Sequence, residues 1–315
     1  MFRKRQCFLV LTGLLLSTLA LAACGNNGGT GASDEDGAEA SQQGEAARSE
    51  LLIGVIPAQG SNQMEEGADK LAGILQEALG YEVRAEVYPD YNGVVEAMGA
   101  DKVQMAYLGP LTYVEAHERY GVEAIVTQLI EGKPYYYSYL ITQADSPYET
   151  FEDVEAHAAD IRFAFGDISS TSGSLIPGIA LKDAGLFESQ QAHSFASVVY
   201  TGDHTATALA VQNGQQDIGA IDSAYFNNLV KQGTIDGDKL KIVWESEPLF
   251  QYPWAVTGGV GEQDRAIIRD AMLAIDDPVI LSAFGGASGF TEAANADYAA
   301  IRDAAIADGR LQTAD

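Results

Sequence analysis

Cysteine and histidine are scarce in this chain. Its 315 residues include two cysteines, Cys7 and Cys24, and four histidines, none of them at metal-ligand spacing from another. The sequence also has no Gly-x-Ser-x-Gly nucleophile elbow, no Walker-type phosphate loop and no Gly-x-Gly-x-x-Gly turn after a strand. No disulfide can therefore form within residues 25–315. We expect no enzymatic activity, no bound metal and no cofactor.

Basic residues are also few. Lys and Arg number 18 against 45 Asp and Glu, which gives a formal net charge of −27. A surface this acidic argues against nucleic acid and against docking on anionic lipid as partners. An anionic small ligand is still compatible with it, because salt screens distant charges and a local cluster of donors acts at contact distance.

The N-terminus has the pattern of an export signal. Arg3, Lys4 and Arg5 precede a short apolar run that reaches Ala23. The end of the run, Leu21-Ala22-Ala23-Cys24-Gly25, resembles the bacterial lipoprotein box, in which Cys24 carries the lipid. We therefore expect a lipoprotein signal peptide at residues 1–23 and an extracytoplasmic protein anchored to the cell membrane by its lipid. The alternatives are an ordinary signal peptide or an uncleaved anchor.

The next segment, residues 24–50, is rich in Gly, Ala, Ser, Gln and acidic residues and shows no hydrophobic periodicity. Such a composition is typical of a disordered tether. The remaining 265 residues, Leu51 to Asp315, are enough for a sizeable core or for two lobes.

Strand-like and helix-like segments alternate through this domain. The order strand, helix, strand, helix, strand over residues 51–108 predicts a parallel sheet with helices on its faces. The pattern begins again after Asp145-Ser146-Pro147, and Ala97–Ala106 can be laid on Ala210–Gly219, each as helix end, turn and strand. We predict two α/β lobes with a ligand cleft between them, lobe 1 from residues 51–142 and 250–315 and lobe 2 from residues 143–249.

A hydroxyl-rich turn stands out in the second repeat. Gly166-Asp167-Ile168-Ser169-Ser170-Thr171-Ser172-Gly173-Ser174 follows an apolar strand and precedes a segment that could begin a helix. Amides at a helix start, with Ser and Thr hydroxyls beside them, form a receptor for anions. Plain helix capping accounts for Ser and Thr there equally well. Pro177 removes one backbone donor and is expected to delay or kink the helix.

Four other residues are candidates for the same cleft. His204 precedes a helix and would donate to an oxyanion when protonated, and Asp222 ends a strand, where it would accept a ligand proton or orient His204. Tyr91 and Tyr137 would add hydroxyls, the latter from the expected crossing between lobes. Each also has a simpler interpretation, as a capping residue for His204 and Asp222 and as core packing for the tyrosines.

Several of these motifs together resemble the phosphonate/phosphite-type solute-binding proteins of ABC importers. The resemblance rests on Ser170-Thr171-Ser172-Gly173 with Pro177, Tyr107-Leu108-Gly109-Pro110, His204 with Ala208-Leu209-Ala210-Val211, and Gly289-Phe290 near Asp297-Tyr298. It implies a type II periplasmic-binding-protein-like fold that closes on an oxyanion, with a membrane permease as partner and a monomeric receptor. It also implies ligand contacts from Ser170, Thr171, Ser172 and His204 in one lobe and from Tyr91 and Tyr137 in the other lobe or the hinge.

The sequence departs from members that bind aminoalkylphosphonates. Their two acidic residues for the ligand amine align with Ala224 and Tyr252, which leaves Asp222 to accept a proton from a smaller ligand such as phosphite or a short alkylphosphonate. Three alternatives stay open: the same fold with a sulfonate, sulfate or neutral heterocycle, a surface hydrolase acting on phosphate or phosphonate esters, and a signalling lipoprotein whose closure is read by a sensor.

Overall fold

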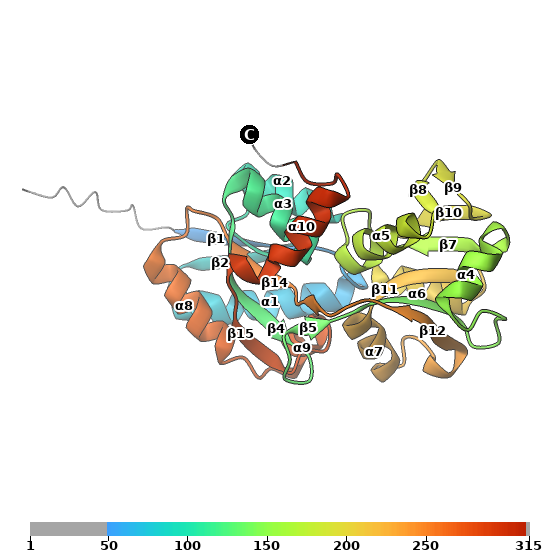
Figure 1. Cartoon of the computed structure of the whole chain (residues 1–315). Helices are drawn as coiled ribbons and strands as arrows, with labels where there is room; N and C mark the ends of the chain where they lie inside the picture. Colours follow the sequence, from blue (N-terminus) through green and yellow to red (C-terminus); the bar gives the residue numbers. More distant parts are fainter. Residues whose placement is uncertain (1–48, 313–315) are drawn as a thin grey trace, which may run out of the picture. The chain divides into compact units, whose positions relative to one another are not determined.

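The computed structural model describes residues 49–312, which belong to a single compact unit of the chain (Figure 1). The expected signal peptide, the lipidated Cys24 and all but the last two residues of the expected tether fall outside the described residues. The tether was expected to reach residue 50, but strand β1 already begins at Glu50. No helix among residues 49–312 is both long and apolar enough to cross a bilayer.

The first sheet has six strands in the order β15-β4-β14-β3-β1-β2. β1, β2 and β3 run parallel, as the sequence predicts, while β14 and β15 are antiparallel to their neighbours. Their bounds are β1 Glu50–Val55, β2 Glu82–Val87, β3 Met105–Tyr107, β4 Glu123–Leu129, β14 Pro253–Val256 and β15 Gly289–Glu292.

The second sheet has five strands in the order β10-β7-β11-β6-β12. β7, β10 and β11 are parallel, and β6 is antiparallel to β11 and β12. Their bounds are β6 Ser138–Gln143, β7 Arg162–Phe165, β10 Ser197–Tyr200, β11 Ile218–Asp222 and β12 Leu240–Glu245. Both sheets therefore share one plan, three parallel strands followed by an antiparallel strand that arrives from the other lobe. This is the repeat that the two similar segments suggested.

Two connections join the lobes through a small ladder of β5 and β13 (Tyr135–Tyr136 with Leu249–Phe250). The first part of lobe 1 was expected to end at residue 142, but β6 pairs with β11 and β12 and so belongs to the second sheet. The sequence could not show this, because the residues of an apolar strand are compatible with either sheet. We accordingly propose that the first lobe boundary lies at the end of β5.

Helices cover both sheets. In the first lobe they are α1 Ser61–Leu79, α2 Tyr91–Gly99, α3 Pro110–Tyr120, α8 Glu262–Leu273, α9 Pro278–Ala283, the 3₁₀ turn Asn295–Tyr298 and α10 Ala299–Ala307. In the second they are α4 Phe151–His157, the 3₁₀ turn Ala158–Asp160, the π-turn Thr171–Leu175, α5 Ile176–Asp183, α6 His204–Gln212, α7 Ser223–Lys231 and the 3₁₀ turn Gly237–Lys239. A short hairpin, β8 Phe187–Ser189 and β9 Ala192–His193, follows α5.

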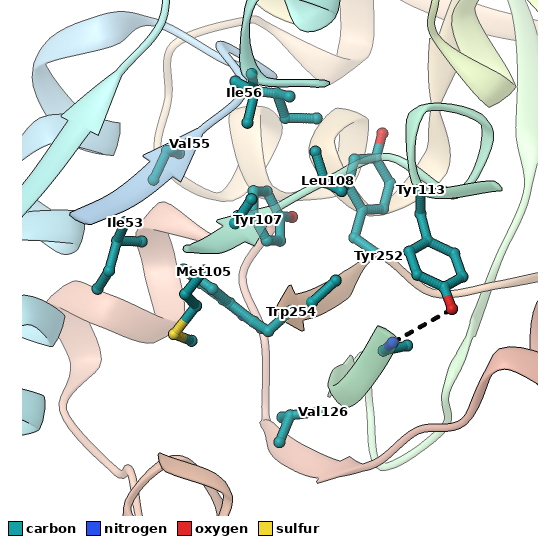
Figure 2. Packing of buried hydrophobic residues seen from close by; sticks show 14 of the residues in the cluster. Ile53, Val55, Ile56, Met105, Tyr107, Leu108, Tyr113, Val126, Tyr252 and Trp254 are labelled. Carbon is teal, nitrogen blue, oxygen red and sulfur yellow. Dashed lines mark hydrogen bonds between the residues drawn. The ribbon is translucent and has the colours of Figure 1, made fainter. Parts of the chain in front are cut away.

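The core of the first lobe is aromatic where it approaches the second. Tyr107, Tyr252 and Trp254 are fully buried and lie in ring contact, with centroids 5.0–5.4 Å from Tyr107 to the other two (Figure 2). Tyr113 packs nearby and its hydroxyl accepts a hydrogen bond from the Ala124 N–H at 3.2 Å (Figure 2). These large rings form a rigid floor at the carboxyl end of β3, which is where α/β folds present their ligand sites.

Candidate functional site

The hydroxyl-rich turn is a π-turn held by its own backbone. β7 ends at Phe165, and the Ser170 hydroxyl caps the turn by accepting from the Gly173 N–H at 3.0 Å. Pro177 cannot donate to the Gly173 carbonyl four residues earlier, and that carbonyl accepts from the Gly166 N–H at 2.8 Å instead. A Cβ on Gly173 would lie 2.9 Å from the Ser170 hydroxyl, so the close approach requires glycine. The bond between Gly166 and Gly173 thus ties the turn to the end of β7.

The three hydroxyl residues at this turn have different partners. Ser170 is the cap, and the Thr171 hydroxyl accepts from the Leu111 N–H at 2.8 Å, where α3 of the first lobe begins. The Ser172 hydroxyl is buried without a hydrogen-bond partner, while its carbonyl accepts from the Ser138 hydroxyl at 2.6 Å. Of these three residues, only Ser172 has a hydroxyl without a hydrogen-bond partner. The N–H groups of Thr171 and Ser172 also have no acceptor within the turn, since they are at its start.

His204 is completely buried at the start of α6. Its Nδ1 accepts from the Asp222 N–H at 3.4 Å, which leaves the proton on Nε2 to be donated to the Tyr252 hydroxyl at 3.2 Å. Burial lowers the pKa of His204 to about 3, so the ring is neutral at neutral pH. The sequence predicted a protonated donor, but the imidazole offers a single N–H. It also stacks on Tyr225 with a centroid separation of 5.4 Å.

Asp222 caps α7 with one oxygen and leaves the other free. Oδ1 accepts from the N–H groups of Ala224 and Tyr225 at 2.6 and 3.1 Å. Oδ2 is buried and has no hydrogen-bond partner. Burial raises the pKa of Asp222 to about 7, and the two backbone N–H groups and the nearby Tyr252 hydroxyl offset only part of that effect. Both uses that the sequence suggested, cap and acceptor, are available on one side chain.

On the first lobe, Tyr91 and Tyr136 supply buried hydroxyls without partners. Tyr91 begins α2 behind its cap Asp90, and Tyr136 lies in β5, with Thr171 and Ser172 next to its hydroxyl. Tyr137, the residue chosen from the sequence, is half-buried and lines a groove at the surface with Tyr135. Successive side chains of an extended chain point to opposite faces. The sequence prediction named Tyr137, which points outward, and its neighbour Tyr136 is the one that points inward.

Sequence reasoning missed three more aromatic residues at the same place. The hydroxyls of Tyr107 and Tyr225, one from each lobe, lie 2.9 Å apart, and Tyr107 also donates to Gln128 Oε1 at 2.9 Å. Tyr252 receives the His204 N–H and has Asp222, Tyr91, Tyr136 and Tyr225 as its electrostatic neighbours. Tyr107 and Tyr252 each occur where a strand meets a Pro or Gly-Pro step, which is the only signal that could have marked them.

The assembled site contains four buried polar atoms without partners: Tyr91 Oη, Tyr136 Oη, Ser172 Oγ and Asp222 Oδ2. They come from both lobes. Burial raises the pKa of Tyr91 and of Tyr136 well above the ordinary value, the nearby Asp222 raises each further, and Ser172 beside the Tyr136 hydroxyl lowers that of Tyr136. No Lys or Arg is among the main causes of these shifts. Within residues 49–312 no three His, Cys, Asp or Glu side chains gather as a metal site. The arrangement offers three hydroxyl groups and one carboxylate to a small polar ligand.

Comparison with known proteins decides the family. Residues 53–298 match the model of the ABC-transporter phosphonate periplasmic substrate-binding proteins. The chain belongs to this family. Its two-lobed α/β architecture is accordingly of the type II periplasmic-binding-protein kind, as the motifs of the hydroxyl-rich turn indicated.

Relatives in the family are named for different phosphorus ligands. The chain is 30% identical over 197 residues to the phosphonates-binding periplasmic protein of Escherichia coli, an alignment that covers 62% of this chain and 57% of that protein. It is 29% identical over 220 residues to the phosphate-import protein PhnD of Mycolicibacterium smegmatis, with 68% of each chain covered.

Two solved structures have the same fold. A binding-protein component of a Pseudomonas aeruginosa ABC phosphonate transporter superposes with a TM-score of 0.72 at 25% identity, over 83% of this chain and 87% of the other. Prochlorococcus marinus PhnD1 in complex with methylphosphonate gives a TM-score of 0.74 at 21% identity, over 84% and 99% of the two chains. At this identity the second likeness shows the fold alone.

Proposed function

We propose that this family member is the extracytoplasmic receptor of an ABC importer, and that its lobes close on a small phosphorus oxyanion that carries one negative charge and one proton. The observation that supports this most strongly is the set of four unpartnered atoms, Tyr91 Oη, Tyr136 Oη, Ser172 Oγ and Asp222 Oδ2. A buried polar group without a partner is costly, so a ligand that satisfies all four is favoured by each of them.

The donors suit phosphorus-bound oxygens. Three hydroxyls and the first N–H groups of the π-turn at Thr171 direct the positive ends of their dipoles toward the ligand. The neutral His204 holds the Tyr252 hydroxyl in place through a hydrogen bond. Hydrogen bonds from such groups to an ionised oxygen are stronger than those between neutral groups. The site therefore needs no basic side chain to hold a single negative charge.

Asp222 sets the protonation state of the ligand. A dianion beside an ionised, buried carboxylate would bring three negative charges together without a cation, which is strongly unfavourable. A P–OH group facing Asp222 Oδ2 removes that conflict, because it donates its proton to the free oxygen. Oxyanions of this class lose their second proton near neutral pH, with a pKa of about 6 in phosphate esters. Phosphite and short alkylphosphonates fit this requirement.

The choice among phosphorus ligands follows from the surroundings of Asp222. Phosphonate, phosphate and methylphosphonate appear in the names of relatives and their complexes. Ala224 and Tyr252 stand where amine-binding acids are expected, and Tyr252 uses its hydroxyl on His204. An ammonium group would find Asp222 as its only carboxylate among the site residues described above, in competition with the P–OH. We infer a preference for ligands without an amine.

The remaining assignments belong to the same proposal. Cys24 carries the lipid, the segment from there to residue 49 is the tether, and a monomeric receptor presents its closed lobes to a membrane permease. The family places such receptors outside the cytoplasm. No specific feature of the site favours hydrolysis or a sensor partner. Among the site residues described above, only Asp222 has a pKa near neutrality, and this residue already caps a helix.

Calorimetric titration of the compact unit Glu45–Asp315 tests the proposal. Phosphite, phosphate, methylphosphonate, 2-aminoethylphosphonate and methanesulfonate are titrated in parallel at pH 6 and pH 8. We expect tight binding of at least one phosphorus ligand without an amine, weaker at pH 8 where the ligand loses its proton. Methanesulfonate has no proton for Asp222 and is expected not to bind. Tight binding of the sulfonate, or of no phosphorus ligand, would contradict the proposal.

A further inference from the structure

We propose that Arg310, in the segment after α10, is a positioning residue for the hydroxyl-rich turn and reaches it from the opposite lobe. Its Nη1 donates to the Ile168 carbonyl at 2.8 Å and to the Ser174 hydroxyl at 2.9 Å. Ile168 and Ser174 flank Ser170, Thr171 and Ser172. One guanidinium from the first lobe thus spans the turn that holds the unpartnered Ser172 hydroxyl. This inference rests on the proposed function of that turn.

The chain around Arg310 is built to hold it in place. Gly309 has φ +75°, a conformation that glycine adopts freely and that ends α10 and reverses the chain. After this reversal the N–H groups of Arg310 and Leu311 both donate to the Ala305 carbonyl, at 2.9 and 3.2 Å. Ala305 and Leu311 are buried in the core of the first lobe, so Arg310 projects from a segment anchored on both sides.

A nearly buried carboxylate completes the contact. Asp308 accepts from Arg310 Nε at 2.9 Å and from Lys182 Nζ of α5 at 2.7 Å, and its side chain is 4% exposed. Lys182 belongs to the second lobe, so this ion pair also crosses the boundary between lobes. We use the name C-terminal latch for Asp308, Arg310 and Lys182 together with the two groups of the turn that accept from Arg310, the Ile168 carbonyl and the Ser174 hydroxyl. In Figure 1 the end of α10 lies beside α5, as these bonds require.

The guanidinium packs against the first turns of α5. A Cβ added to Gly178 would lie 3.4 Å from Arg310 Nη2, at the edge of ordinary van der Waals contact. Leu111, Glu115, Lys182, Tyr200, Asp308 and Arg310 line an adjoining surface pocket of about 570 Å³. A planar guanidinium with several donors in a fixed geometry satisfies a carbonyl, a hydroxyl and a carboxylate together, which an ammonium cannot do.

The latch connects ligand retention to the C-terminal segment. The bonds to Ile168 and Ser174 form only when the lobes are together, so they stabilise the closed arrangement of the turn and not the first encounter with ligand. Removing them is expected to raise the dissociation rate and to leave the association rate nearly unchanged.

The test compares Arg310→Gln with Arg302→Gln in the full chain. Arg302 lies in α10 and pairs with Glu118 and Asp303 inside the first lobe, so each variant removes one guanidinium and its ion pairs. Stopped-flow tryptophan fluorescence with methylphosphonate should show dissociation about tenfold faster in the Arg310 variant, equivalent to about 1.4 kcal/mol. Arg310→Lys should recover part of the loss. The Arg302 variant should match the wild type.

A measurement without ligand separates this proposal from the previous one. Amide hydrogen exchange of residues 166–176 in the ligand-free full chain should be faster in the Arg310 variant than in the Arg302 variant. Equal exchange in this segment, with equal dissociation rates, would overturn the latch. A wild-type chain that binds no phosphorus oxyanion but shows the difference in exchange would overturn the proposed function and leave the positioning role intact.

Discussion

Replacing Asp222 with Asn should make the ligand-free protein more stable at neutral and alkaline pH. Burial raises the pKa of Asp222 to about 7, whereas an unfolded Asp titrates near its ordinary value of about 3.9. A difference of about 3 pKa units corresponds to about 4 kcal/mol at 1.36 kcal/mol per unit, taken as an upper bound. Asn is as good a helix cap as Asp, so the bonds to the N–H groups of Ala224 and Tyr225 are retained.

The sign of the pH dependence follows from proton binding. Below about pH 4 the carboxyl is protonated in both folded and unfolded chains and contributes no difference. Between about pH 4 and 7 the folded protein keeps a proton that the unfolded chain has lost, so the free energy of unfolding falls as pH rises. Above pH 7 the whole penalty is present. The stability gain of Asp222→Asn should therefore be small at pH 4.5 and reach about 2–4 kcal/mol at pH 8.

Urea unfolding of wild type and variant at pH 4.5, 6, 7 and 8 measures this gain. Comparison with the wild type is necessary because Glu115, whose pKa burial also raises to about 7, shifts wild-type stability in the same direction. Asp90→Asn is the matched control, since Asp90 also caps a helix through a backbone N–H but is exposed. A gain at Asp222 that does not change with pH, or that equals the gain at Asp90, would refute the reasoning.

The same substitution should weaken ligand binding while it stabilises the fold. Asn presents an N–H group where Asp222 Oδ2 is free, so a ligand P–OH meets a donor in place of an acceptor. An unmatched buried pair of this kind costs about 2 kcal/mol, or about 30-fold in affinity for methylphosphonate at pH 7, where Asp222 is ionised in about half of the molecules. Calorimetric titration of the variant checks this loss, and an unchanged affinity would show that Asp222 does not face the ligand proton.

The remaining predictions concern the hydroxyl groups. Tyr136→Phe should weaken phosphorus-ligand binding about tenfold or more by removing one buried donor, whereas Tyr137→Phe should leave the affinity unchanged. Calorimetric titration of both variants measures the two affinities, and equal affinities would contradict the proposed site. Ser172→Ala should likewise reduce affinity about tenfold with little change in unfolding. Ser170→Ala should lower the free energy of unfolding by about 1 kcal/mol through loss of the cap, measured by urea unfolding, and equal stability of the two serine variants would show that their roles are not divided.

Local sequence patterns identified the hydroxyl-rich turn and the repeat that contains it, because both are written in neighbouring residues. A strand, a turn rich in Ser and Thr and a helix start occur in order over residues 161–184, and the structure follows that order. The same local pattern did not say which hydroxyl is free. Ser170 and Ser172 differ only in the direction that the π-turn gives them, and that turn depends on the carbonyl which Pro177 leaves for Gly166.

Local sequence patterns could not predict the contacts between segments that lie far apart in the chain. Tyr136 and Tyr137 are identical residues in sequence, and the pairing of β5 with β13 decides which of them is buried. Similarly, β6 was expected in the first lobe, because its apolar residues are compatible with either sheet until β11 and β12 pair with it. Tyr107 and Tyr225 belong to different lobes, and no local signal brings their hydroxyls to 2.9 Å.

The sequence by itself determined the α/β repeat, the absence of catalytic and metal motifs and the side-chain chemistry of the hydroxyl-rich turn, since these depend on composition, periodicity and short spacing. The tertiary structure alone decided the neutrality of His204, the raised pKa of Asp222 and the bonds of Arg310 across the lobes. Burial and the partners available in space set each of these properties, and both arise only when segments far apart in the chain pack together.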